Sequence, residues 1–313
     1  MDFLTWVLVN GPVGAVNFMM NAFFIFCMVN PLHGEKIKQP LKFLLALLVG
    51  STTVYLMSTF GVFFSEGKND NKISVASFLI SVCCLSVSIS SSVWLNFFYY
   101  TQIVPAQRAL FVWIKKNIKP VIFGVIIFEN VFGLLDFTVE LLNVRLDQLE
   151  FNETSTNYQN IIERNLIQHQ EDVYIILISI QRFHFYSSFF VMMMSSGATV
   201  VYLCRHMQHM AAHGQSLSCP RLSSQVRVTI TGIIQGFHFL SLTVWRDYNF
   251  VSQHFSDKTI EQYIFTTVIN FYLSATAFWL GAGQVVFRQR AADVWTRAAQ
   301  WCNDLTMQLP QGA

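Results

Sequence analysis

The sequence has few charged residues, since only 12% of its 313 positions are Asp, Glu, Lys or Arg, against about 25% in soluble domains. Its cations are dispersed and leave a net charge of +2, so they form no basic stripe for nucleic acid. The six cysteines lack metal-ligand spacing, and no nucleophile motif or phosphate-binding loop is present. The N-terminus lacks the basic region of a cleavable signal peptide. What remains is a 53% hydrophobic chain, which predicts a membrane protein with several spans.

Seven apolar stretches are long enough to cross the hydrocarbon core, which takes about 20 helical residues. They predict an all-α fold: a seven-transmembrane-helix bundle over residues 1–288, followed by a short cytoplasmic amphipathic helix and tail over 289–313. The third stretch exceeds the bilayer thickness, so we expect it to tilt or project. The predicted spans are residues 4–29, 41–64, 73–104, 118–142, 173–204, 226–251 and 260–287.

The basic residues predict the orientation of these spans. With the N-terminus outside, thirteen of the twenty Lys and Arg fall on inner segments, as the positive-inside rule requires. The acids gather instead in a predicted outer loop at 143–172, which also holds the sequon Asn152-Glu153-Thr154. N-glycosylation occurs on the outer side. The chain is therefore predicted to lie in the plasma membrane, with the N-terminus outside, the C-terminus inside and a glycan at Asn152.

One stretch, WLNFFYYTQIVPAQRALFVWIKKNIKP at 94–120, turns from apolar to basic at the inner end of the third span. Within it, FYYTQIVPAQRALFVWIKKNIK resembles the third span and second inner loop of bitter taste receptors (type 2 taste receptors), a family of G-protein-coupled receptors. YLCRHMQHM resembles the same family at the inner end of span five. Pro220 stands where the family has an inner-loop proline. The rhodopsin-like DRY and NPxxY signatures are absent.

This resemblance implies a receptor for small, mostly apolar bitter molecules that activates a heterotrimeric G protein of the gustducin or inhibitory type. It also implies an inner crevice for the G protein, and the cationic inner surface suits anionic membrane lipids as well. The residues predicted for G-protein coupling are Gln102, Arg108, Lys115, Lys116, His206, Met210 and Arg227.

Polar-tipped aromatic residues in the outer and middle spans suit a ligand cavity, although at helical spacing they can equally be core packing. By resemblance, His184 and His238 fall at outer-pocket positions of bitter receptors, and Ser90 replaces the ligand-site Trp of span three. The candidate ligand-binding residues are Ser90, Trp94, Gln181, His184, His238, Trp245, Thr266 and Phe271.

Three acids, Glu129, Asp136 and Glu140, share one face of the fourth span. Carboxylates inside a membrane usually face the bundle and pair with other groups. Arg182 on span five is a possible partner for Asp136 or Glu140. The acids therefore predict either a structural ion pair or a ligand counter-ion.

Other classes of protein remain open at this stage. A pheromone-type vomeronasal receptor shares the architecture, and a transporter is a further alternative. His206, His209 and His213 resemble one histidine box of a di-iron desaturase, but the remaining histidines are scattered and one box is insufficient for di-iron chemistry. We therefore expect no enzyme activity, no metal and no cofactor.

Overall fold

The computed structural model of the chain describes residues 3–30, 39–66, 71–106, 108–153, 161–213, 220–255 and 262–308. Within these ranges the chain is helical apart from short turns, and it contains no strand. Seven of the helices are long and apolar enough to cross a membrane. The predicted all-α, seven-helix fold is confirmed.

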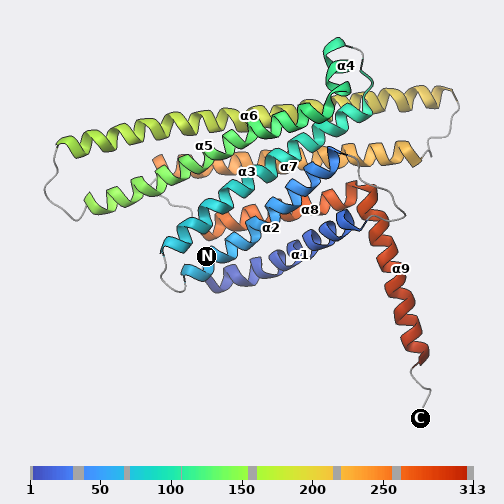
Figure 1. The fold of residues 1–313 in the computed structure, drawn as a ribbon, viewed down its shortest axis with the longest axis horizontal. Helices are drawn as coiled ribbons and strands as arrows, with labels where there is room; N and C mark the ends of the chain where they lie inside the picture. Colours follow the sequence, from blue (N-terminus) through green and yellow to red (C-terminus); the bar gives the residue numbers. More distant parts are fainter. Residues whose placement is uncertain are drawn as a thin grey trace.

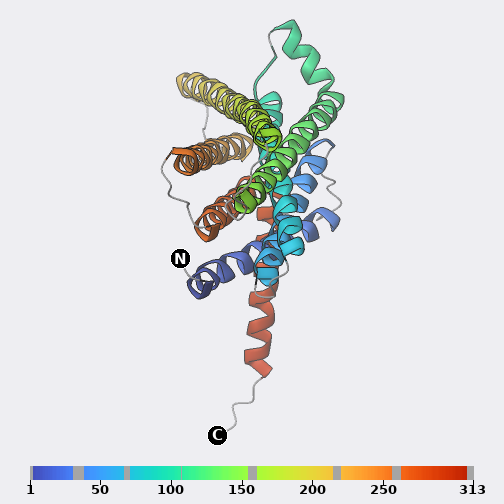
Figure 2. The same cartoon turned by 90° about the vertical axis from the view of Figure 1, so that its left-hand side faces the viewer.

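The helices follow the predicted spans closely at most of their ends, and Figure 1 shows the seven long apolar ones running side by side. A short helix, α4, separates the third and fourth spans, and α9 follows the seventh. These two project in opposite directions from the same end of the bundle (Figures 1 and 2). The helices are α1 Phe3–Val29, α2 Leu41–Glu66, α3 Asn71–Ile103, α4 Ala109–Lys116, α5 Ile118–Glu153, α6 Ile161–Ala212, α7 Pro220–Phe255, α8 Gln262–Gly283 and α9 Val285–Gln308.

Helix α3 lies at the centre of the bundle, where it contacts α2, α5, α6 and α7. Helix α1 packs against α2 and α8, and α8 also packs against α7. In the end-on view of Figure 2, α3 accordingly lies between the α1–α2 side and the α6–α7 side. A change that moves α3 therefore reaches most of the other helices.

The described parts of the predicted loop at 143–172 are helical. Helix α5 continues to Glu153 and α6 begins at Ile161, so the helical pair extends well beyond the predicted spans. The sequence has no Gly or Pro between 134 and 196, and these are the residues that most strongly interrupt a helix. With 52 residues, α6 is roughly 78 Å long at 1.5 Å per residue. The sequon begins in the last turn of α5, at Asn152, but its Thr154 lies outside the described residues.

The apolar side chains divide between an interior and an exposed belt. Large side chains such as Phe24, Phe239 and Leu48 are almost completely buried between helices. Others of equal size face outward, including Phe183 at 77% and Ile127 at 70% exposure. Exposed apolar surface of this extent marks an environment other than water, which agrees with the membrane-spanning fold.

Amide side chains join α1 to α8. Asn270 Nδ2 donates to Asn10 Oδ1 at 2.9 Å, and Asn10 Nδ2 donates to Thr267 Oγ1 at 2.8 Å. Farther along the same interface, Asn17 Nδ2 donates to Ser274 Oγ at 2.7 Å. Polar groups that are removed from water need such partners. We call these five residues the α1–α8 amide seam.

Candidate functional site

Six helices enclose a cavity of about 610 Å³, including its mouth, in the half of the bundle away from α4 and α9. The wall is mostly apolar and aromatic. It is formed by Tyr55, Thr59 and Val62 of α2, Phe78, Ser81, Val82, Leu85 and Ser86 of α3, Asp136 and Glu140 of α5, Phe185 of α6, Arg246 of α7, and Phe265, Thr266 and Ile269 of α8.

The charged groups on this wall are held by their neighbours. Asp136 is only 1% exposed and accepts a hydrogen bond from Nε2 of Gln181 on α6. The guanidinium of Arg246 lies over the ring of Phe185, 4.3 Å from the ring centre, a distance at which cation and ring attract. The cavity therefore presents an apolar surface with a few oriented polar groups.

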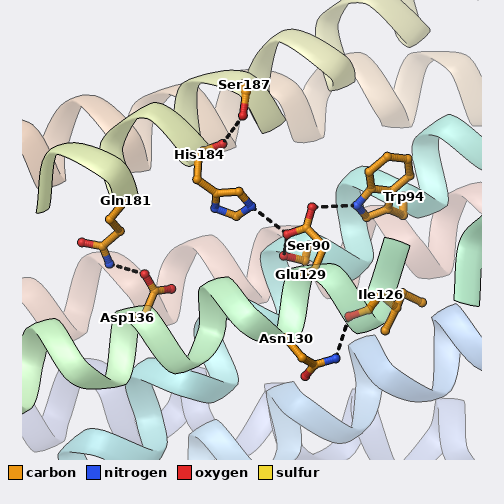
Figure 3. Close-up of polar contacts among 9 residues, drawn as sticks. All are labelled: Ser90, Trp94, Ile126, Glu129, Asn130, Asp136, Gln181, His184 and Ser187. Atoms are coloured by element: carbon orange, nitrogen blue, oxygen red, sulfur yellow. Dashed lines mark hydrogen bonds and ion pairs between the residues drawn. The ribbon is translucent and has the colours of Figure 1, made fainter. Parts of the chain in front are cut away.

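Below the cavity, Glu129 on α5 is the centre of a buried polar cluster (Figure 3). Its carboxylate accepts hydrogen bonds from Ser90 Oγ at 2.9 Å and Trp94 Nε1 at 3.1 Å, both on α3. His184 Nε2 on α6 lies 2.8 Å from Glu129 Oε2. Phe132 stacks on the His184 ring at 4.0 Å. We call these five residues the Glu129 cluster.

The Glu129 cluster is a junction of three helices. A buried carboxylate is costly unless several groups pair with it, and here donors from α3 and α6 meet one acceptor on α5. Glu129 lies seven residues before Asp136, which is roughly 10 Å along the helix. The cluster is therefore a second polar layer, two turns below the cavity wall.

The sequence singled out Ser90, Trp94 and His184 as ligand contacts, and the structure brings all three together. It does so around Glu129, however, and not on the cavity wall. His184 Nδ1 is buried and has no hydrogen-bond partner within the described part of the chain. These three residues support the cavity from below.

Of the other five candidate ligand residues, Gln181 bonds to the cavity residue Asp136, and the remaining four lie apart from one another. Thr266 lies on the cavity wall and accepts a hydrogen bond from Trp6 Nε1 at 3.2 Å. His238 Nδ1 lies 2.7 Å from the carbonyl oxygen of Ile234, one turn back in its own helix. Trp245 Nε1 is buried and lacks a hydrogen-bond partner among the described residues. Phe271 is 52% exposed on the outside of α8.

Arg182 has a partner that the sequence did not suggest. Its Nε lies 3.5 Å from Asp247 Oδ1 on α7, and Asp247 also accepts a hydrogen bond from Tyr186. Asp136 bonds to the preceding residue, Gln181. Because successive residues of a helix point in different directions, Gln181 reaches α5 while Arg182 reaches α7.

Phe185 and Arg246 also line the wall, although neither was a candidate. Phe185 lies among other aromatic residues and does not stand out, whereas Arg246 stands out as a charged residue within the sixth predicted span. Asp136 and Glu140 did carry a signal, because intramembrane carboxylates are rare and face the bundle interior. Their shared face on α5 could have located the cavity.

The opposite half of the bundle has a smaller cavity of about 280 Å³, between α3, α7 and α8. Its lining includes Tyr99, Gly232 and Gln284. A Cβ atom on Gly232 would come within 2.8 Å of Asn96 Oδ1, so glycine permits the close approach of α3 and α7 here. Asn96 Nδ2 in turn donates to Ser196 Oγ on α6 at 2.7 Å.

The predicted coupling residues lie around this end. Lys115 and Lys116 occupy the last turn of α4, and Arg108 directly precedes its first residue. Lys115 Nζ is 3.4 Å from the carbonyl oxygen of Val104. Gln102 is exposed near the end of α3, Met210 lies in the last turns of α6, and Arg227 is exposed in the first turns of α7. His206 stacks on Tyr202.

Two arginines, Arg227 on α7 and Arg288 on α9, lie close enough for their charges to interact. Burial and the nearby Arg227 together lower the pKa of Arg288 from its ordinary value. This end therefore carries positive charge that the described residues leave partly uncompensated.

The histidines of the predicted box lie along the last turns of α6. The rings of His209 and His213 are 4.3 Å apart. Among the described residues, no three His, Cys, Asp or Glu side chains are placed to hold one metal ion.

A family model described as "Taste receptor protein (TAS2R)" matches residues 3–298, which is almost the whole chain. No curated protein matches the chain.

Proposed function

The chain belongs to the taste receptor protein (TAS2R) family of G-protein-coupled receptors, and on that premise we propose that it binds small, mostly apolar bitter molecules in the six-helix cavity. Binding is transmitted to a heterotrimeric G protein of the gustducin or inhibitory type at the basic end. Because the family consists of receptors, we propose no catalytic activity and no cofactor. The family match also favours this function over a pheromone-type receptor or a transporter.

The cavity is the observation that carries this proposal. Its wall takes residues from α2, α3, α5, α6, α7 and α8, so one bound molecule would contact six of the seven spans at once. A ligand shifts a conformational equilibrium only if it binds one arrangement better than another. A site shared by many helices is well suited to that, because any relative helix movement changes its shape.

The Glu129 cluster provides a route from the cavity toward the basic end. Gln181 holds the cavity residue Asp136, and His184 holds Glu129 one turn further along α6. A ligand that displaces α6 at the cavity would therefore strain the bonds that join α6 to α5 and α3. In the present arrangement three side chains bond to the carboxylate, so a movement of α6 that breaks the His184 bond would separate the inactive from the active state.

At the basic end, the α3–α7 approach would open to admit the G protein. In the structure Gly232 on α7 lies directly against the side chain of Asn96 on α3, so no space is left between the two helices at this point. The cations nearby, Lys115, Lys116 and Arg227, suit an acidic or carboxylate-bearing segment of the G protein, because complementary charge speeds and orients association.

The proposed orientation places the cavity at the extracellular side and the basic end in the cytoplasm of the plasma membrane. The distribution of Lys and Arg supports this, and glycosylation at Asn152 would follow from it. A mobility shift on deglycosylation that disappears in Asn152→Gln would support both points together.

The function is tested by expressing the full chain with a promiscuous G protein and recording calcium responses to a panel of bitter compounds. The first active compound is then applied to Phe185→Ala. Phe185 lies on the cavity wall, and losing a buried aromatic contact lowers potency by roughly 30-fold.

Phe183→Ala is the matched control, because Phe183 lies two residues away on the same helix but is 77% exposed. We expect it to respond like the parent. Equal potency of the two variants would remove the cavity from the proposal, and a chain expressed at the cell surface that answers no compound would contradict the function.

A further inference from the structure

A long apolar groove lies in the corner between α1, α8 and α9, outside the ligand cavity. It encloses about 810 Å³, including its open side. Its lining includes Met20 and Phe23 of α1, Phe278 and Ala282 of α8, and Ala291 of α9. The stacked rings of Phe24 and Phe287, 4.5 Å apart, fix α9 to α1 beside it. Helix α9 leaves the bundle sideways from this corner (Figure 1).

One charged residue, Arg288, also lines this groove. Its Nη1 is buried and has no hydrogen-bond partner among the described residues. No carboxylate in the described ranges forms an ion pair with Arg288, whereas its neighbours Arg290 and Arg297 both pair with Asp293. A buried guanidinium donor without a partner is costly, so an anionic group at the groove would compensate it.

Arg290, on the same turn of α9, also has a buried donor group without a partner among the described residues. The guanidinium of Arg290 lies 5.0 Å from the ring centre of Phe26 on α1, and its Nε is likewise buried without a partner in the described part of the chain. Arg227 adds a further positive charge toward α7. The apolar groove thus ends at a group of cations with spare donors.

From these observations we infer that the groove binds an anionic glycerophospholipid of the leaflet next to α9, with an acyl chain along α1 and α8 and the phosphate at Arg288. The groove offers an apolar surface for the acyl chain and, at Arg288, a positive charge for the phosphate. These follow one another as the acyl chain and the headgroup do in such a lipid. A zwitterionic lipid could fill the groove but would compensate the cations less, because its headgroup carries no net charge. The inference is independent of the agonist, of the G protein and of which face of the membrane α9 lies on.

The test is native mass spectrometry of the purified full chain in detergent, titrated with dioleoyl phosphatidylserine or dioleoyl phosphatidylcholine. The acyl chains are identical, so any preference comes from the headgroup. We expect the first bound phosphatidylserine to be held roughly tenfold more tightly, as one or two lipid–arginine contacts imply. Equal binding of the two lipids would overturn the inference.

Substitutions locate the site. Arg288→Gln is expected to remove most of the headgroup preference, and Arg288→Lys, which keeps the charge, to retain much of it. Arg297→Gln is the matched control, because Arg297 is on the same helix but its side chain is 71% exposed. If Arg297→Gln reduced the preference as much as Arg288→Gln, general surface charge would explain the binding and the site would be refuted.

The acyl-chain part of the inference has its own test. Ala291→Trp would fill the groove and is expected to weaken both lipids equally, which also keeps the inference testable if Arg288→Gln fails to fold. Inorganic phosphate at matched ionic strength should leave the lipid bound. Displacement by phosphate would show a bare anion site and would overturn the lipid assignment.

Discussion

The two ends of this bundle differ in how the helices enclose space. At one end six helices surround a cavity of about 610 Å³ with Asp136, Glu140 and Arg246 on its wall. At the other, three helices leave only about 280 Å³, and the nearby charges, Lys115, Lys116 and Arg227, are all positive. On the proposed function, the first end holds the small molecule. The second is narrowed by the close contact of Gly232 on α7 with Asn96 on α3, and the proposal requires this contact to open before a G protein enters.

The largest effect is expected from filling the cavity with a bulky side chain. Ser86 is 7% exposed and lies on the cavity wall. Ser86→Phe places a ring in the space proposed for the agonist, so agonist potency in the calcium assay should fall about 100-fold, or ~2.7 kcal/mol.

Ser241→Phe makes the same substitution at an exposed position of α7 and should leave potency unchanged. If Ser86→Phe reached the cell surface and kept full potency, agonists would have to bind elsewhere.

The layer between the two ends is tested through Glu129. Glu129→Ala leaves Ser90, Trp94 and His184 without their common acceptor. Stranding buried donors should lower the free energy of unfolding by about 2 kcal/mol, measured by thermal unfolding of the purified receptor.

The α1–α8 amide seam supplies the control for Glu129. Asn17→Ala removes one neutral hydrogen bond, to Ser274, which contributes about 1 kcal/mol. Equal losses in the two variants would show that the Glu129 cluster is no more than another polar contact.

At the closed end, Gly232→Ala should crowd the Asn96 side chain on α3, since the added Cβ would lie 2.8 Å from Asn96 Oδ1 and Asn96 is held by its bond to Ser196. Because overpacking costs roughly 1–3 kcal/mol, the closed state should lose population. We expect agonist-independent GTP exchange to rise roughly fivefold.

Gly197→Ala on α6 is the matched change, because no atom lies within 4 Å of its added Cβ. Unchanged or lower basal exchange in Gly232→Ala would mean that the α3–α7 contact does not hold the receptor inactive.

The smallest effect concerns the charges at the basic end. Lys116→Gln should weaken G-protein binding about two- to threefold, because an exposed charge contributes little and is screened by salt. The difference from the parent should shrink as the salt concentration rises. A loss that persists at high salt would point to a structural role of Lys116 instead.

The seven membrane-spanning helices could be predicted because the apolar stretches are long and separated by charge. The short helix α4 could not, nor could the helical extension of α5 to Glu153 and of α6 back to Ile161, since polar composition was read as loop although Gly and Pro are absent there. The site was predicted in part. Ser90, Trp94 and His184 do come together, but their common partner Glu129 was assigned to a different role.

The cavity wall was the least predictable part. Whether Gln181 or Arg182 faces α5 depends on the rotation of α6, and a uniformly apolar helix does not specify that rotation. Arg246 reaches the cavity because it lies over Phe185, a contact between α7 and α6 that no spacing along the chain encodes. The orientation of Phe271 could not be predicted for the same reason, because its helix is apolar on both faces; the structure places this side chain on the outside of α8.

The assignment of one end to the agonist and the other to the G protein depends on orientation. The most direct measurement is epitope labelling of cells that express the full chain with one tag before residue 1 and a different tag after residue 313. We expect antibody to bind the N-terminal tag on intact cells and the C-terminal tag only after permeabilisation. Labelling of the C-terminal tag on intact cells would place the basic end outside and contradict the account.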